Sequence, residues 1–268
     1  MTFDDILTLI HNTSADPALI EVNGISDHWA QGRTVFGGLS AAMAHAAIER
    51  QLPDQRHIRS MAVNFVGPLL TDTPFQIHSE ILRKGKNVVH AAAKVMQQDK
   101  VCLVVQSCFG FDRDSKINHP HQIRHEMILP KKANFIPQVP KVVPKFLRHF
   151  DLAIEKGLPF TGSKSNDMRG WLRFKNAPTE INNAHLIALL DAYPSVALQN
   201  LRWPAPASSL SWFVEFIYPY TKIDVTDWLA YEAIARQAAQ GYVHEQAYMW
   251  NSHGHLVAIS TQTVTIFD

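Results

Sequence analysis

The sequence predicts an α+β protein built from two copies of one unit. Residues 36–110 and 181–267 follow the same plan, a helix rich in small residues and then four long strand-like segments that end at a Phe. The best-matching pieces are FVGP (65–68) with FIYP (216–219), and QSCFGF (106–111) with QTVTIF (262–267). The second pair places Gln106 and Gln262 at the same step of the last strand. Two large copies indicate a duplicated domain rather than a solenoid of many small repeats.

The first copy follows a helix predicted over 1–12, where apolar residues recur near helical spacing, and strands predicted over 17–23 and 28–30. A helix is expected over 35–52, because Gly37 and Gly38 punctuate its start and Pro53 ends it. Four strands follow, at about 57–66, 74–84, 87–97 and 101–111. Short breaks separate the last three of these strands, which are therefore expected to pair as antiparallel neighbours.

The second copy repeats this order after a connector. Residues 112–169 contain six prolines with many Lys and His, and a short helix near 145–156 is the one element considered there. A strand over 171–175 leads to a helix over 181–192, which Asn182 or Asn183 caps and Pro194 ends. The strands after it are expected at about 208–218, 228–238, 241–250 and 256–267. The chain therefore divides into a unit at 1–111, a connector at 112–169 and a unit at 170–268.

Composition excludes several classes of protein. The chain has 268 residues, 46% of them hydrophobic, which is ample for a core, and a formal net charge of +1, which gives no general attraction to nucleic acid or to an anionic membrane. No stretch approaches 18 apolar residues, and acids occupy the N-terminal positions where a signal peptide needs bases. Cys102 and Cys108 share one predicted strand, too far apart for a disulfide, which favours a reducing compartment. A cytoplasmic protein without a membrane span is expected.

Three passages resemble one known family. They are FGGLSAA (36–42), where Gly-Gly opens a helix, ALLDAYPS (188–195), where an apolar run closes on Asp and a turn with Pro, and LVAISTQT (256–263), an apolar strand with a Gln near its end. In order and spacing they resemble acyl-CoA thioesterases of the type II, TesB-like class, and NFVGP (64–68) resembles the exit of that family's first-unit strand. The resemblance covers most of the chain outside the connector. It implies a double hotdog fold, two units that each wrap a long helix in an antiparallel sheet, with the sheets joined side by side.

The resemblance also implies site residues. In that family, hydrolysis is attributed to an Asp on the second hotdog helix, a Ser or Thr on the following strand and a Gln on the last strand. Carried onto this chain, these are Asp191, Ser209 and Gln262. Ser208 and Ser211 are alternative matches for the hydroxyl, because a small shift of the alignment selects them instead.

One passage departs from the family pattern. Some members carry an Asp-His pair just after the hydroxyl residue, and Leu210, Ser211 and Trp212 occupy that region here. The departure affects the register of the strand and the substrate pocket.

The chemistry of a thioester suits these residue types. Hydrolysis of a thioester needs a carboxylate to polarise a water and polar groups to orient that water. It also needs N–H donors that bind the carbonyl oxygen as negative charge develops on it. Asp191 continues the helical spacing of Ala184, Ile187 and Ala188, so its side chain is expected on the same face of the helix as theirs. Gly37 and Gly38 open a helix whose free N–H groups are suited to bind the carbonyl oxygen of the substrate.

Each residue also has a purely structural explanation. Asp191 is equally consistent with an exposed acid at the frayed end of a helix. Gly37 and Gly38 are equally consistent with a tight turn that only glycine allows. Ser209, which alternates with Ser211, Phe213, Glu215 and Ile217, is explained by a hydrogen bond to nearby backbone. Gln262 shares a strand face with Ser260 and Val264, where a cross-strand hydrogen bond satisfies its amide.

Other chemistries lack support in the sequence. There is no G-x-S-x-G nucleophile motif. The histidines at 119, 121, 125, 253 and 255 lie in the connector or a turn and lack the Cys, Asp or Glu spacing of a metal site, so no metal is predicted. No cofactor is expected either. The tryptophans at 203, 212, 228 and 250 are expected in the core or at a dimer face.

The sequence therefore predicts an acyl-CoA thioesterase that releases a free acid and CoA, through a water activated by Asp191 with Ser209 and Gln262. The alternative is a non-catalytic double hotdog that binds acyl-CoA or a lipid, which the departure at Leu210–Trp212 favours. A hotdog hydratase ranks last, because no Asp and His pair in the required order occurs near residues 185–195. By analogy with double hotdogs that pair through sheet edges, a homodimer is expected.

Overall fold

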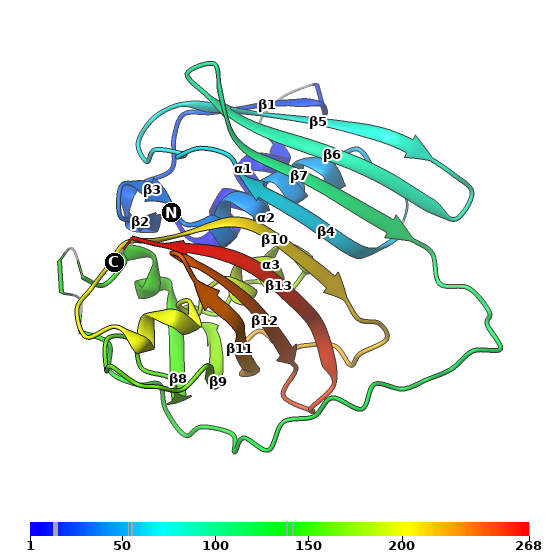
Figure 1. Cartoon of the computed structure of the whole chain (residues 1–268). Coiled ribbons are helices and arrows are strands. Elements are labelled where there is room, and N and C mark those ends of the chain that lie inside the picture. The colour runs from blue at the N-terminus through cyan, green and yellow to red at the C-terminus, as the bar shows by residue number, and fades with distance from the viewer. Residues whose placement is uncertain (13–15, 53, 55, 138, 141, 268) are drawn as a thin grey trace.

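The fold is a large antiparallel sheet that curves around the helices (Figure 1). The computed structural model describes residues 1–12, 16–52, 54, 56–137, 139–140 and 142–267. The first unit comprises α1 (Phe3–Asn12), β1 (Leu19–Val22), β2 (Ala30–Gln31), β3 (Thr34–Val35), α2 (Gly37–Glu49), β4 (His57–Phe65), β5 (Phe75–Lys84), β6 (Val88–Gln97) and β7 (Lys100–Gly110). The second comprises β8 (Phe150–Lys156), β9 (Asp167–Phe174), α3 (Asn183–Leu190), β10 (Ala207–Phe216), β11 (Leu229–Ala239), β12 (Tyr242–Trp250) and β13 (Leu256–Ile266).

The sheet joins the two units through their central strands. In the described residues its eleven strands run in the order β1-β5-β6-β7-β4-β10-β13-β12-β11-β9-β8, and β2 pairs with β3 alone. Outward from the β4–β10 pair, the series β7-β6-β5 on one side matches β13-β12-β11 on the other. Strands β4 and β10 pair from Ser60 with Glu215 to Asn64 with Ser211, so the sheet continues from one unit into the next. This is the double hotdog arrangement that the sequence predicts.

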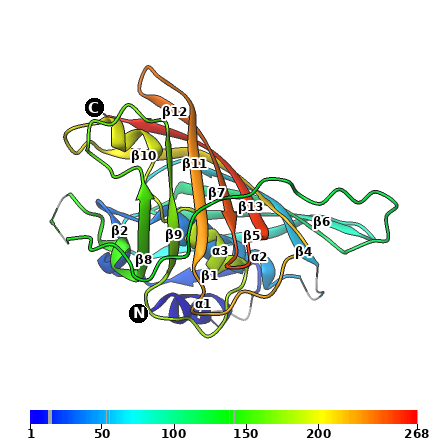
Figure 2. The same ribbon diagram turned by 90° about the horizontal axis from the view of Figure 1, so that it is seen from below.

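Helix α2 lies at the centre of the first unit. Eleven of its residues are buried, because α1, α3 and the inner face of β5, β6 and β7 surround it. A helix that is apolar all round must be buried in this way. Its alanines lack bulky side chains, so α3 packs directly against it, and the core formed by the two helices is continuous across both units. Figure 2 shows the helices lying within the curve of the strands.

The predicted helices and strands of the two units are confirmed, with ends that move by a few residues, except the strand expected over 28–30. Asp27–Trp29 forms a 3₁₀ segment there, and strand β2 begins only at Ala30. The short helix considered near 145–156 is wrong. Only Lys145–His149 forms a single 3₁₀ segment, and Phe150–Lys156 continues as strand β8, which pairs with β9 at the edge of the sheet. Phe150, Leu152 and Ala153 are buried there, so packing against the sheet outweighs the helical spacing of the apolar residues.

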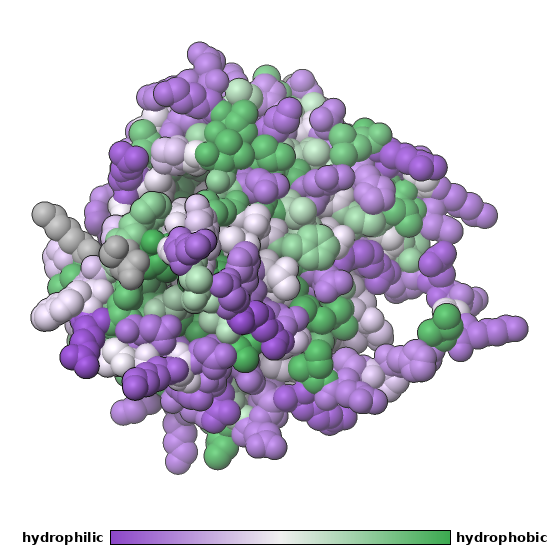
Figure 3. Space-filling view, in the orientation of Figure 1, coloured by the Kyte–Doolittle hydropathy of each residue, from purple (hydrophilic) through white to green (hydrophobic). Residues whose placement is uncertain are grey.

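The connector crosses the outside of the second unit. Residues 112–119 are exposed and without regular structure, and Figure 3 shows a largely hydrophilic arm that stands away from the body of the molecule. Further on, Trp250 Nε1 donates to the carbonyl oxygen of Ile123, and Met127 is buried with Trp171 and Trp250. Within the described residues, no helix is long and apolar enough to cross a membrane.

Candidate active site

The structure brings Asp191, Ser209 and Gln262 together. Gln262 Nε2, on β13, donates to Asp191 Oδ1 at 3.2 Å and to Ser209 Oγ at 2.5 Å. Asp191 is the residue at which α3 ends, and Ser209 lies near the start of β10. Gln262 therefore links the carboxylate to the hydroxyl. Both contacts are made by the Gln262 side-chain nitrogen, which only donates. Asp191 Oδ1 therefore acts as an acceptor, a role that a carboxyl oxygen can fill in the ionised or the neutral form.

A β-bulge turns Ser209 into the site. The pairing of β10 with β13 slips between Ser209, opposite Val264, and Ser211, opposite Thr263, which leaves Leu210 unpaired. Ser209 therefore shares the inward face with Trp212 and the residues that alternate with it. The prediction that Ser209 shares a face with Ser211, Phe213, Glu215 and Ile217 is wrong, because the extra residue of a bulge inverts the alternation. It also makes Ser209, rather than Ser211, the hydroxyl beside Gln262.

Gly37 and Gly38 allow the N-terminus of α2 to approach Asp191. A Cβ atom on Gly37 would lie 2.9 Å from Asp191 Oδ2, and one on Gly38 would lie 3.0 Å from Asp191 Cβ and closer still to the Phe36 ring. The backbone of Gly38 hydrogen-bonds the carboxylate. The site is therefore assembled across the two units, since the glycines belong to the first and the carboxylate to the second.

The surroundings of Asp191 favour its neutral form. Burial raises the pKa of the Asp191 carboxyl to about 7, against the hydrogen bonds from Gln262 and Gly38, and the charge of Glu245 adds to the increase. A carboxyl group with this pKa is about half ionised at neutral pH, the condition in which a general base works best. Perturbation of this kind is more frequent at functional sites than elsewhere.

Glu245 is a second carboxyl group at the site, which the sequence analysis did not identify. It lies on β12 directly opposite Gln262 and is only 8% exposed. Its carboxylate accepts from Ser195 Oγ and from the backbone N–H groups of Val196 and Ala197, and burial raises its pKa to about 7. A signal was present in the sequence, because Glu245 occupies an inward position between Val243 and Ala247 on an alternating strand.

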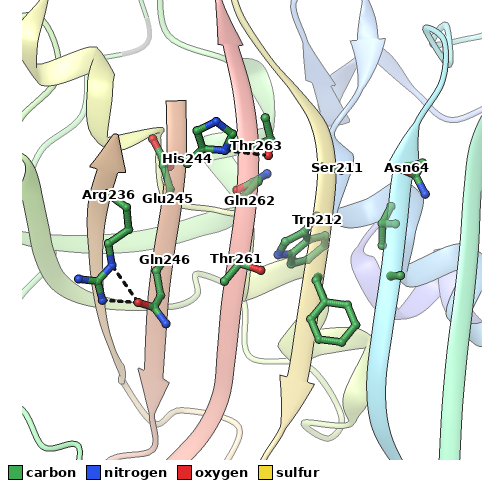
Figure 4. A pocket seen from close by; sticks show the side chains of 13 residues that line it. Asn64, Ser211, Trp212, Arg236, His244, Glu245, Gln246, Thr261, Gln262 and Thr263 are labelled. Atoms are coloured by element: carbon green, nitrogen blue, oxygen red, sulfur yellow. Dashed lines mark hydrogen bonds between the residues drawn. The ribbon is translucent and has the colours of Figure 1, made fainter. Parts of the chain in front are cut away.

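A groove lies behind the site, on the outer face of the same strands (Figure 4). Thr261 and Thr263 line it from either side of Gln262, whose side chain belongs to the opposite face. Arg236, which hydrogen-bonds Gln246, adds a positive charge to the groove, and His244 also lines it. The groove is thus separated from Asp191 by the thickness of the sheet.

Comparison with known proteins gives the same family for both units. Residues 25–110 match the model of the acyl-CoA thioesterase N-terminal domain, and residues 129–266 match that of the acyl-CoA thioesterase C-terminal domain. No curated protein matches the chain closely enough to count as a relative.

Solved structures share the fold at low sequence identity. A hot dog fold protein of unknown function from Alicyclobacillus acidocaldarius superposes with a TM-score of 0.84 at 21% identity, over 98% of each chain. A putative thioesterase II from Thermobifida fusca gives 0.81 at 16% identity, over 100% of this chain and 98% of that one. The acyl-CoA thioesterase II TesB2 from Mycobacterium marinum gives 0.73 at 16%, over 99% and 98%. With both domain models matched in chain order, this protein belongs to the acyl-CoA thioesterase family.

Proposed function

We propose that this protein hydrolyses acyl-CoA thioesters to a free carboxylic acid and CoA, at the site formed by Asp191, Ser209 and Gln262. The observation that carries the proposal is the half-buried Asp191, whose carboxyl is held by Gln262 and set against the N-terminus of α2. A half-buried carboxylate with an amide and a hydroxyl group beside it is the set of groups that can activate and orient a water for thioester hydrolysis.

In the proposed reaction, Asp191 takes a proton from a water as the water oxygen bonds to the thioester carbon. Gln262 and Ser209 orient that water, since both contact the same carboxylate network. Gly38 already binds the Asp191 carboxylate, and the other N–H groups at the start of α2, near Gly37, are available at the positive end of the helix dipole to stabilise charge on the carbonyl oxygen. The C–S bond then breaks, and the CoA thiolate receives the proton that Asp191 holds.

A non-catalytic acyl-CoA or lipid carrier is the second candidate function. The passage Leu210–Trp212 motivates it, since it lacks the Asp-His pair of some relatives. The bulge at Leu210 lies within this passage and still leaves Ser209 beside Gln262. This geometry favours the hydrolase over the carrier.

The test is thiol release from acyl-CoAs, detected with a chromogenic thiol reagent. The panel runs from acetyl to palmitoyl and includes phenylacetyl-CoA, and a blank corrects for the partly exposed thiol of Cys108. We expect turnover by the wild type and a loss of roughly 100-fold or more in kcat for Asp191→Asn, which keeps the shape but not the base.

Asp224→Asn is the matched control, because Asp224 is exposed and its substitution should leave the rate unchanged. A wild type that binds acyl-CoA without releasing thiol would establish the carrier instead. Full activity in Asp191→Asn would remove Asp191 from the proposed role.

A further inference from the structure

The two units are related by a pseudo-twofold axis between β4 and β10. Besides the matching strand order, the two halves carry β-bulges at corresponding places, at Arg59 in β4 and at Leu210 in β10. The residues after these bulges define the equivalence. Met61 pairs with Ser107 in the first unit, as Trp212 pairs with Gln262 in the second.

This register corrects one expectation from the sequence. The repeat predicts that Gln106 and Gln262 occupy the same step, but the strand pairing makes Ser107 the counterpart of Gln262. Gln106 is exposed, whereas Ser107 is 1% exposed and faces the interior. The match of the sequence letters is displaced by one residue, which is enough to change the face of a strand.

The helices obey the same symmetry. Phe36 precedes α2 and Asn182 precedes α3, and counting nine residues on from these caps reaches His45 in the first unit and Asp191 in the second. The first unit therefore places His45 and Ser107 where the second places the base and the amide of the candidate active site.

Both of these side chains are buried and incompletely bonded. His45 is 0% exposed, and neither its Nδ1 nor the Ser107 Oγ has a hydrogen-bond partner among the described residues. A buried polar atom without a partner costs free energy, so two of them at one symmetry-related position indicate groups that await a ligand or water. Phe109, two residues from Ser107 on the inner face of β7, stacks on His45 with ring centroids 5.9 Å apart.

His45 has the arrangement of a histidine base. Its Nε2 lies 3.1 Å from Glu49 Oε1, one helical turn on, which leaves Nδ1 as the free ring nitrogen. Burial opposes ionisation of Glu49, but His45 and a hydrogen bond from Asn183 lower its pKa below the usual value. A carboxylate that binds one nitrogen of an imidazole orients the ring and sets which nitrogen carries the proton.

The residue at the strand exit beside each of these two positions differs between the units. Gly67 in the first unit corresponds to Tyr218 in the second, because FVGP and FIYP occupy equivalent strand exits. The hydroxyl of Tyr218 donates to Asn183 Oδ1 at 2.9 Å, at the N-terminus of α3, where the candidate active site has Gly37. Tyr218 also packs on His57, with ring centroids 4.4 Å apart. A tyrosine side chain thus lies at this strand exit beside the start of α3, whereas the glycine at the corresponding exit, Gly67, contributes no side chain.

We propose that the first unit contains a second acyl-thioester hydrolysis site, in which His45, oriented by Glu49, is the base and Ser107 positions the water, behind Tyr218. The water oxygen bonds to the thioester carbon while its proton passes to His45 Nδ1. The C–S bond breaks, and the leaving thiolate takes that proton from the imidazolium. The inference rests on the proposed function, since it assigns the same substrate class to both sites.

The experiment uses Asp191→Asn as background, so that only the second site can act. Thiol release is measured for this variant and for the double variants that add Ser107→Ala or His45→Gln. We expect the background to retain slow release and each double variant to lose it by roughly tenfold or more. Ser107→Ala should fold normally, because it removes a hydroxyl that has no partner.

Asp191→Asn with Ser40→Ala is the matched control, since Ser40 is also buried on α2 but its hydroxyl donates to the Phe36 carbonyl oxygen. Its release should equal that of the background. Binding of a non-hydrolysable thioether analogue of acyl-CoA is titrated in parallel. In Asp191→Asn the analogue should occupy a second site in addition to the candidate active site. Adding Tyr218→Phe should increase the rate at which the analogue binds to this second site.

The outcomes separate the two proposals. If the wild type releases thiol but Asp191→Asn is silent, or if Ser107→Ala leaves its residual rate unchanged, the second site is overturned and the proposed function stands. If the wild type itself is silent on the whole panel, the proposed function fails and hydrolysis at the second site fails with it.

Discussion

At the scale of single residues, the chemistry depends on two carboxyl groups, that of the half-buried Asp191 and that of the buried Glu245. Burial is the main cause that raises the pKa of each to about 7, and the charge of Glu245 raises that of Asp191 further. Two groups that interact in this way titrate as a pair, so the apparent pKa values belong to the site rather than to either residue.

We expect the rate of hydrolysis to rise with pH and to reach half its maximum near pH 7, because only the ionised Asp191 acts as a base. Glu245→Gln should move this midpoint to lower pH, since it removes a negative charge that raises the pKa of Asp191. The measurement is kcat/KM between about pH 5.5 and 8.5. Glu215→Gln, at an exposed position on β10, is the control. A profile that is flat through pH 7 would contradict the role of Asp191.

Stability should show the opposite dependence on pH. A carboxyl whose pKa is higher in the folded than in the unfolded protein stabilises the fold below its unfolded pKa of 3.8, and this stabilisation is lost progressively as the pH rises from there to about 7. Asp191→Asn should therefore raise Tm by roughly 2–5 °C at pH 8 and by a clearly smaller amount at pH 5. Calorimetry at both pH values tests this, with Asp224→Asn as control. An equal change in Tm at both pH values would show that the charge of Asp191 is not what destabilises the fold.

At the scale of elements, the N-terminus of α2 is shaped to receive Asp191. We expect Gly37→Ala to lower kcat/KM by about tenfold or more, because its Cβ would lie 2.9 Å from Asp191 Oδ2 and displace the carboxylate. Gly110→Ala is the matched control, since the nearest atoms to its Cβ would be 3.6 Å away. Kinetics and Tm should be measured together. A large fall in Tm for Gly37→Ala would point to a turn that needs Gly, rather than to the approach of Asp191.

The elements themselves were largely predictable, for identifiable reasons. Two prolines in the sequence predict where the helices end, although Pro53 lies outside the described residues, and alternating apolar residues between Gly, Pro and Lys breaks predict the strands. The bulge at Leu210 was not predictable, because no local residue type marks it and the partner strand β13 sets its position. Strand β8 was missed because its apolar residues also fit helical spacing, and only its edge pairing with β9 decides between the two.

The candidate site was predictable only in part. Asp191, Ser209 and Gln262 were named from the family resemblance, and the structure brings these three side chains together. Glu245 was missed because no passage of the resemblance covers it, although an acid among inward-facing residues is a signal that alternation alone reveals. The counterpart of Gln262 was misplaced by one residue, since a match of sequence letters does not show which residues pair across the strands.

At the scale of the whole molecule, the shared sheet and the packing of α2 on α3 hold the two units together, and both are independent of the arm at 112–119. The core of buried residues runs from α1 and α2 through α3 to β13 without a break. The arm at 112–119, by contrast, is exposed. The exposed arm therefore only links the units along the chain, while burial of apolar surface, to which Phe146 and Phe150 of the connector contribute, holds them in place.

We expect a cut within 112–119 to leave an active protein. A protease recognition sequence placed between Ser115 and Lys116 should be cleaved readily, because the segment is exposed and without regular structure. The two fragments should then elute together on gel filtration and keep most of the acyl-CoA hydrolysis, since the candidate site requires Gly37 from one fragment and Asp191 from the other. The uncut protein with the same insertion is the control. Fragments that separate in buffer would show that the connector, and not the joined sheet, maintains the site, because neither fragment alone can bring the start of α2 to the end of α3.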